Sequence, residues 1–181
     1  MNLFLIGYRC SGKTTVGKSI ADALDWAFVD ADALLVDDYG KSIKDIIDTD
    51  GWEAFRRIEH STLKQICAAD RQVVATGGGA VLDAANVKAM KTSGQIVWLK
   101  ATAATIRKRM QADQNTGDFR PALTQKGSLA EIEDLLTARH PYYERASDFV
   151  IHTDSLPVAE IAHQILHKLN QAVLQIGAQN T

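Results

Sequence analysis

The sequence has only two cysteines, Cys10 and Cys67, among 181 residues. This is too few for a disulfide framework and favours a reducing cytoplasm. Excess positive charge is also missing, because the formal net charge is -2 and leaves no global field that would attract nucleic acid. No run approaches the roughly 18 apolar residues of a membrane span, and there are no internal repeats or low-complexity tracts. We therefore expect a soluble, cytoplasmic protein with neither a membrane nor a nucleic-acid partner.

The composition that remains is suited to one α/β domain. Hydrophobic residues make up 46% of the chain, which is enough for a substantial core. Short apolar runs typical of buried strands are separated by segments with helical spacing. We expect a single domain over residues 1–174, a monomeric state, and a frayed C-terminal tail over residues 175–181.

The most specific motif is G-x-x-x-x-G-K-T, from Gly7 to Thr14. An apolar run precedes it and helix-type spacing follows it, which is the context that a phosphate-binding P-loop requires. Glycines let successive backbone amides point at an anion, and the helix N-terminus adds positive charge. The alternative, a glycine turn that binds nothing, is disfavoured by this context. The candidate ATP-binding residues of the loop are Gly7, Cys10, Ser11, Gly12, Lys13, Thr14 and Thr15.

Two carboxylates, Asp30 and Asp32, follow the predicted strand Ala27–Val29. They fall at a strand's carboxyl end, where ligands bind in open parallel sheets. One could serve a hydrated Mg²⁺ and the other a substrate hydroxyl. The alternative is that either residue only caps the helix that follows.

Two predicted helices each place an arginine on their apolar stripe. In the helix from Trp52 to Ala69, Arg56 and Glu59 lie on this stripe. Arg139 occupies the same kind of position in the helix expected over residues 128–144. Buried charges are costly unless paired. Either Arg56 and Glu59 form an i,i+3 pair, or Glu59 orients Arg56 towards a ligand carboxylate or phosphate, and both can hold together.

A strand predicted over Gln72–Thr76 leads directly into three glycines, Gly77–Gly79. The apolar residues that follow distinguish this segment from a flexible linker, so we expect a ligand-facing loop. This strand carries no aspartate of the Walker B kind. Asp30, or water, must therefore help to hold the metal.

A polar stretch, residues 112–118, ends beside Arg120 and Pro121. A polar segment of this kind in a compact domain is typical of a lid. Arg120 would then reach the transferring phosphate. The alternative is a solvated surface arginine.

Taken together, these motifs resemble those of the shikimate kinase family across about residues 1–170. The P-loop is the only motif among them that is specific alone, but their order and spacing in a chain of this size are specific together. The matching segments are GYRCSGKT at Gly7–Thr14, FVDAD at Phe28–Asp32, FRRIE at Phe55–Glu59, TGGG at Thr76–Gly79, Arg120–Pro121 and the helical Arg139.

The resemblance implies a P-loop kinase fold: a five-stranded parallel sheet of order 2-3-1-4-5 flanked by helices. It also implies a lid over about residues 112–125 and substrate-binding helices over about residues 32–69. The family transfers the γ-phosphate of ATP, with Mg²⁺, to the 3-hydroxyl of shikimate in chorismate and aromatic amino acid biosynthesis.

The resemblance also implies site roles by position. Asp32 would hold the shikimate hydroxyls and accept the proton, and Lys13 and Arg120 would neutralise charge on the phosphates. Thr14 and Asp30 would serve the metal. The remaining implied contacts are Arg56 and Arg139 to the shikimate carboxylate, Gly78 and Gly79 to its ring, and Arg109 to adenine.

Two other functions remain open from the residues alone. A gluconate-type sugar-acid kinase has a similar length and loop and also needs a carboxylate site. A non-catalytic P-loop nucleotide switch would bind nucleotide but has no need of the acceptor pocket that Asp32, Arg56 and Arg139 predict.

Overall fold

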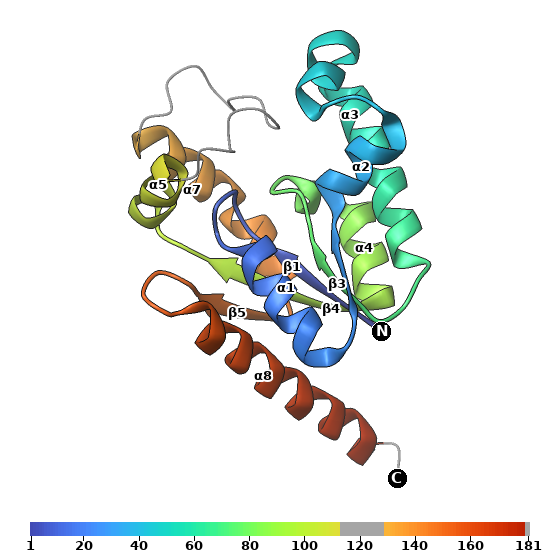
Figure 1. Cartoon of the computed structure of the whole chain (residues 1–181), viewed down its shortest axis with the longest axis vertical. Helices are drawn as coiled ribbons and strands as arrows, with labels where there is room; N and C mark the ends of the chain where they lie inside the picture. Colours follow the sequence, from blue (N-terminus) through green and yellow to red (C-terminus); the bar gives the residue numbers. More distant parts are fainter. Residues whose placement is uncertain (113–128, 180–181) are drawn as a thin grey trace.

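A five-stranded, all-parallel sheet forms the centre of the protein in the computed structural model, which describes residues 1–112 and 129–179 (Figure 1). The strand order is β2-β3-β1-β4-β5, which confirms the expected order. β1 pairs with β3 and β4, with Leu5 opposite both Ala75 and Val97. The strands are β1 (Asn2–Ile6), β2 (Ala27–Asp30), β3 (Gln72–Ala75), β4 (Gly94–Lys100) and β5 (Phe149–His152).

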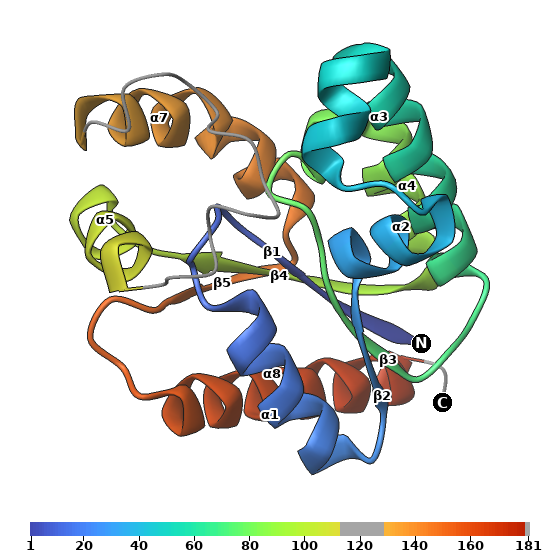
Figure 2. The ribbon, with the colours of Figure 1, turned by 45° about the horizontal axis from the view of Figure 1, so that its top comes forward.

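Helices connect successive strands and cover both faces of the sheet (Figure 2). Helices α1 and α8 lie on one side, and α3, α4 and α7 lie on the other. The helices are α1 (Lys13–Leu24), α2 (Ala31–Tyr39), α3 (Ile43–Cys67), α4 (Ala84–Ser93), α5 (Ala103–Ala112), α7 (Leu129–Ala146) and α8 (Val158–Gln179), with a 3₁₀ turn at Ala80–Leu82. No helix within the described residues is long and apolar enough to cross a membrane.

The apolar run of β1 builds two cores because successive side chains point to opposite faces. Leu3 and Leu5 join a cluster that includes Ile20 of α1. Phe4 and Ile6 join the opposite cluster, which receives side chains from α3, α4 and α7. These four apolar side chains of β1 are fully buried. The P-loop that follows β1 therefore starts from the best-packed strand of the sheet.

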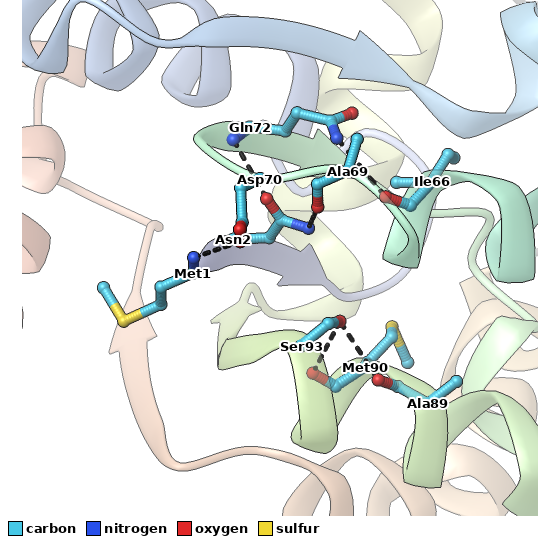
Figure 3. Close-up of polar contacts among 9 residues, drawn as sticks. All are labelled: Met1, Asn2, Ile66, Ala69, Asp70, Gln72, Ala89, Met90 and Ser93. Carbon is cyan, nitrogen blue, oxygen red and sulfur yellow. Dashed lines mark hydrogen bonds and ion pairs between the residues drawn. The ribbon is translucent and has the colours of Figure 1, made fainter.

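The start of β1 is held by side-chain hydrogen bonds to the chain that leads into β3 (Figure 3). The amide of Asn2 donates to the Ala69 carbonyl at 2.7 Å, and its oxygen accepts from the Gln72 backbone N–H at 3.1 Å. The terminal ammonium of Met1 pairs with Asp70. These contacts hold β1 and β3 in register, so that both strands end beside the same loops.

Three helices differ in detail from their sequence expectations. α3 begins at Ile43, ahead of the helix expected from Trp52, and two helical segments meet in it at a kink where Gly51 has a φ of 83° and a ψ of 170°. α7 runs through Pro141 to Ala146. α8 continues to Gln179, although we expected the tail to begin at residue 175.

Candidate active site

The loop between β1 and α1 has backbone geometry that only particular residues tolerate. Gly7 and Gly12 have φ of 141° and 102°, and a Cβ on Gly7 would lie 2.5 Å from the Leu99 carbonyl oxygen. Cys10 also has a positive φ, 58°, which is uncommon for a residue with a side chain. The loop packs so closely over the end of β4 that Gly7 accepts no substituent.

Lys13 lies at the start of α1 and is 6% exposed. Its ammonium donates to the carbonyl oxygens of Gly7 and Tyr8, at 2.9 Å each. The cationic group is thus held at the loop, next to the N-terminus of α1, where an anion is favoured. This arrangement fits a polyphosphate.

Thr14 and Asp30 meet at the ends of neighbouring elements. The Thr14 hydroxyl donates to Asp30 Oδ2 at 3.0 Å. Asp30 also caps α2, because its other oxygen accepts from the backbone N–H groups of Asp32 and Ala33. Capping, which the sequence left as an alternative to metal binding, uses only Oδ1, so Oδ2 beside Thr14 could still serve a metal. A hydroxyl and a carboxylate oxygen are hard ligands that fit Mg²⁺, which usually keeps several waters and binds few protein groups.

An open pocket of about 530 Å³ lies against the P-loop. The pocket is lined by four parts of the chain that lie far apart in the sequence: the P-loop, α2 with α3, the triple-glycine loop, and α7. The lining residues are Tyr8, Arg9, Asp32, Ile43, Ile47, Trp52, Phe55, Arg56, Glu59, Gly77, Gly78, Gly79 and Arg139.

Arg56 and Glu59 form a largely buried ion pair in this pocket. Arg56 Nη1 lies 2.5 Å from Glu59 Oε2, and the two side chains are 29% and 5% exposed. Burial raises the pKa of the Glu59 carboxyl, while the Arg56 charge opposes this shift. The Arg56 guanidinium also lies over the Phe55 ring, 5.0 Å from its centroid. Arg56 therefore pairs with Glu59 and at the same time lines the pocket.

The triple-glycine loop allows these charged groups to approach its backbone. A Cβ on Gly77 would lie 2.7 Å from Glu59 Oε1 and 2.9 Å from Asp32 Oδ1. A Cβ on Gly79 would lie 2.4 Å from Arg56 Nη2. Side chains at these two positions would therefore displace the pocket's own charged groups.

Gly78 joins the pocket to the P-loop and to α7. A Cβ there would lie 3.5 Å from the Gly7 carbonyl oxygen. The Gly78 carbonyl accepts hydrogen bonds from Arg139 Nη1 at 3.3 Å and from the Tyr143 hydroxyl at 2.6 Å. Arg139 also lies 5.7 Å from the centroid of the Tyr8 ring.

Arg109 lies on the other side of the P-loop. Its guanidinium donates to the Cys10 carbonyl at 3.3 Å and to the Thr153 hydroxyl and carbonyl, and so ties α5 to the loop after β5. In that loop, burial alone would raise the pKa of Asp154. Hydrogen bonds from Thr102 and Thr105, together with the Arg109 charge, outweigh burial and lower this pKa. Arg109 thus lies beside the loop, with its guanidinium bound to protein groups.

Two further predictions for the site concern Arg120 with the lid, and Ser11. Arg120 and the lid beyond Ala112 lie outside the described residues. Ser11 is fully buried, and its hydroxyl oxygen has no hydrogen-bond partner among the described residues. The Ser11 side chain is therefore enclosed within the protein.

Sequence reasoning missed several lining residues. Arg9 occupies a variable position of the motif, so the pattern carried no signal for it. Ile43 and Ile47 are apolar residues near the start of α3, a pattern that indicates packing and not ligand binding. Trp52, a large apolar residue of the kind that usually packs in a core, is 46% exposed and lines the pocket. Position in the sequence is the signal that could have found two of them. Arg9 lies inside the predicted phosphate loop, and Trp52 lies four residues before Arg56.

Comparisons with known proteins identify relatives with this architecture. Residues 9–170 match the family model described as shikimate kinase. The shikimate kinase of Symbiobacterium thermophilum is 37% identical, covering 94% of this chain and 97% of that protein. A shikimate kinase from Acinetobacter baumannii, solved in complex with shikimate, is 29% identical, with a TM-score of 0.87 over 94% of this chain and 93% of that one. A gluconokinase from Sinorhizobium meliloti has a TM-score of 0.62 at 19% identity over 99% and 97% of the two chains, a likeness of fold alone.

Proposed function

Because this chain belongs to the shikimate kinase family, an enzyme family that phosphorylates shikimate with ATP, we propose how its own residues carry out that reaction. The gluconate kinase and the non-catalytic switch are not favoured, since the more similar relatives are shikimate kinases. One observation carries the proposal. The pocket that contains Asp32, Arg56 and Arg139 shares a wall with the P-loop, through Tyr8 and Arg9. An acceptor bound there would lie next to a phosphate held by the loop.

The P-loop would bind the ATP phosphates. Lys13 would exchange contacts with its own loop carbonyls for contacts with phosphate oxygens, and the backbone amides of the loop would point at the same anion. Thr14 and Asp30 would hold Mg²⁺, which neutralises phosphate charge when bound. Arg109 would border the adenine side of the loop. Arg120 would bring a further positive charge to the phosphates.

The pocket would orient shikimate through both ends of the molecule. Arg56 and Arg139 would bind its carboxylate, because the guanidinium fork matches two carboxylate oxygens. Gly78 and Gly79 would let the ring approach the backbone. Asp32 would accept a hydrogen bond from the reacting hydroxyl and then its proton. Phosphoryl transfer depends chiefly on such positioning and charge neutralisation.

Asp32→Asn tests this assignment. The amide keeps the size of the side chain but is no base, so we expect kcat to fall by about 10²-fold or more, the usual range for general base catalysis. ATP affinity should remain within about twofold, because Asp32 faces the acceptor pocket. Asp38→Asn is the matched control, since Asp38 is exposed on the same helix. Unchanged kcat in Asp32→Asn would remove this residue from the mechanism.

The assembly and subdomains are also proposals. We infer that the protein acts as a monomer, that residues near 112–125 form a lid, and that residues 32–69 form the substrate-binding helices. Light scattering at working concentration, with and without substrates, tests the monomeric state.

A further inference from the structure

Tyr143 is buried next to the acceptor pocket but does not line it. Its side chain is 1% exposed, and it stacks on Trp98 with ring centroids 5.4 Å apart and an angle of 22° between the rings. Its hydroxyl donates to the Gly78 carbonyl at 2.6 Å. Arg139 also acts on this hydroxyl, through its charge and a side-chain hydrogen bond. Tyr143 is therefore positioned by packing and by polar contacts together.

The same carbonyl oxygen is also the hydrogen-bond partner of Arg139, at 3.3 Å. Arg139 and Tyr143 lie four residues apart on α7, so their side chains fall on one face of the helix. The tyrosine bond is short and the arginine bond is long. Gly78 is therefore held mainly by Tyr143, while Arg139 makes the weaker and more exchangeable contact.

These two contacts bear on how a carboxylate could bind. A backbone carbonyl and a ligand carboxylate are both acceptors, and they compete for the same guanidinium. If Tyr143 did not satisfy the Gly78 oxygen, Arg139 would be that oxygen's remaining partner. The guanidinium would then have to leave a partly buried carbonyl unpaired in order to bind the ligand, which costs free energy.

We propose that Tyr143 is a positioning residue that holds the Gly78 carbonyl and so leaves the Arg139 guanidinium available to the carboxylate of shikimate. This inference rests on the proposed role of Arg139. Burial raises the pKa of Tyr143 to about 12, so the hydroxyl keeps its proton at physiological pH. Because Gly78 also packs against Gly7, the same hydrogen bond keeps the shared wall of the pocket in place.

Tyr143→Phe removes the hydroxyl and keeps the ring that stacks on Trp98. We expect KM for shikimate to rise about three- to tenfold, the equivalent of one net hydrogen bond, with kcat and KM for ATP within about twofold. Tyr142→Phe is the matched control. Tyr142 is the preceding residue, is 37% exposed, and lies against Arg145 rather than Gly78.

Two further variants separate positioning from packing. Trp98→Phe reduces the stacked surface but leaves the hydroxyl, so KM for shikimate should stay within about twofold even if the melting temperature falls. In Arg139→Lys, which loses the fork, adding Tyr143→Phe should raise KM by less than about twofold, because there is no guanidinium left to release. A structural role would instead give the same effect in both backgrounds.

Each outcome decides one claim. If Arg139→Lys uses shikimate normally, the carboxylate role of Arg139 fails and the proposed function must be revised. If Arg139→Lys is impaired but Tyr143→Phe leaves KM unchanged, only the positioning role fails. If Tyr143→Phe weakens shikimate and ATP in parallel, or if Trp98→Phe raises KM equally, then Tyr143 is a packing residue.

Discussion

Arg56→Lys is the most informative perturbation of the acceptor pocket. Lysine keeps the positive charge opposite Glu59 but loses the two-pronged donor that matches a carboxylate. Removing one partner from a desolvated charge pair costs about 2–5 kcal/mol. Because the Arg56 side chain is 29% exposed, we take the lower end, about 2 kcal/mol, which is roughly a 30-fold loss in kcat/KM for shikimate.

The neighbouring arginine provides a matched control for this experiment. Arg57 lies on the same helix, is 70% exposed and pairs with Glu53 at the surface, so Arg57→Lys should leave the kinetics unchanged. The assay is coupled ADP release with shikimate varied at saturating ATP, together with the nucleotide dissociation constant. If Arg56→Lys used shikimate normally, or lost ATP affinity in parallel, the carboxylate clamp would be wrong.

Three further predictions concern other residues. Arg120→Ala should lower kcat by about 10³-fold while ATP affinity changes little, because such an arginine contacts the phosphoryl group during its transfer. A normal kcat would exclude this role. Alkylation of Cys10 should inactivate the enzyme, and bound ATP with Mg²⁺ should slow the alkylation, because the thiol lies in the phosphate loop. Full activity after stoichiometric labelling would show that the thiol has no role in activity. Glu59 holds its proton more tightly in the folded than in the unfolded protein. The free energy of unfolding should therefore fall as pH rises from 4.5 through the raised pKa, and urea titrations should find this slope reduced in Glu59→Gln.

Local patterns predicted the fold because they agree with the global architecture. Leu3–Ile6, the glycine loop and the helix after it specify one βα unit, and the strand order followed from the family resemblance. Helix ends were less predictable. Pro141 does not end α7, because buried side chains pack the helix on both sides of the proline: Ile132 before it, and Tyr143 and Ala146 after it.

The site could be predicted where a residue broke a local rule. Arg56 and Arg139 occupy apolar positions of their helices, and both line the pocket. Tyr143 broke no rule, because a tyrosine on an apolar stripe reads as core, and its bond to Gly78 spans 65 positions of the sequence. Contacts between segments so far apart depend on the sheet topology, and no periodicity in one segment encodes them.

The most direct test of the central claim is coupled ADP release with ATP and Mg²⁺ against shikimate, quinate and gluconate, measured on the same preparation. The pocket should select shikimate, through Asp32 at the hydroxyl end and the two arginines at the carboxylate end. We predict that shikimate stimulates ADP formation far above both other acids and that Asp32→Asn abolishes this difference. Equal or greater stimulation by gluconate, or no acid-dependent ADP formation at all, would contradict the account.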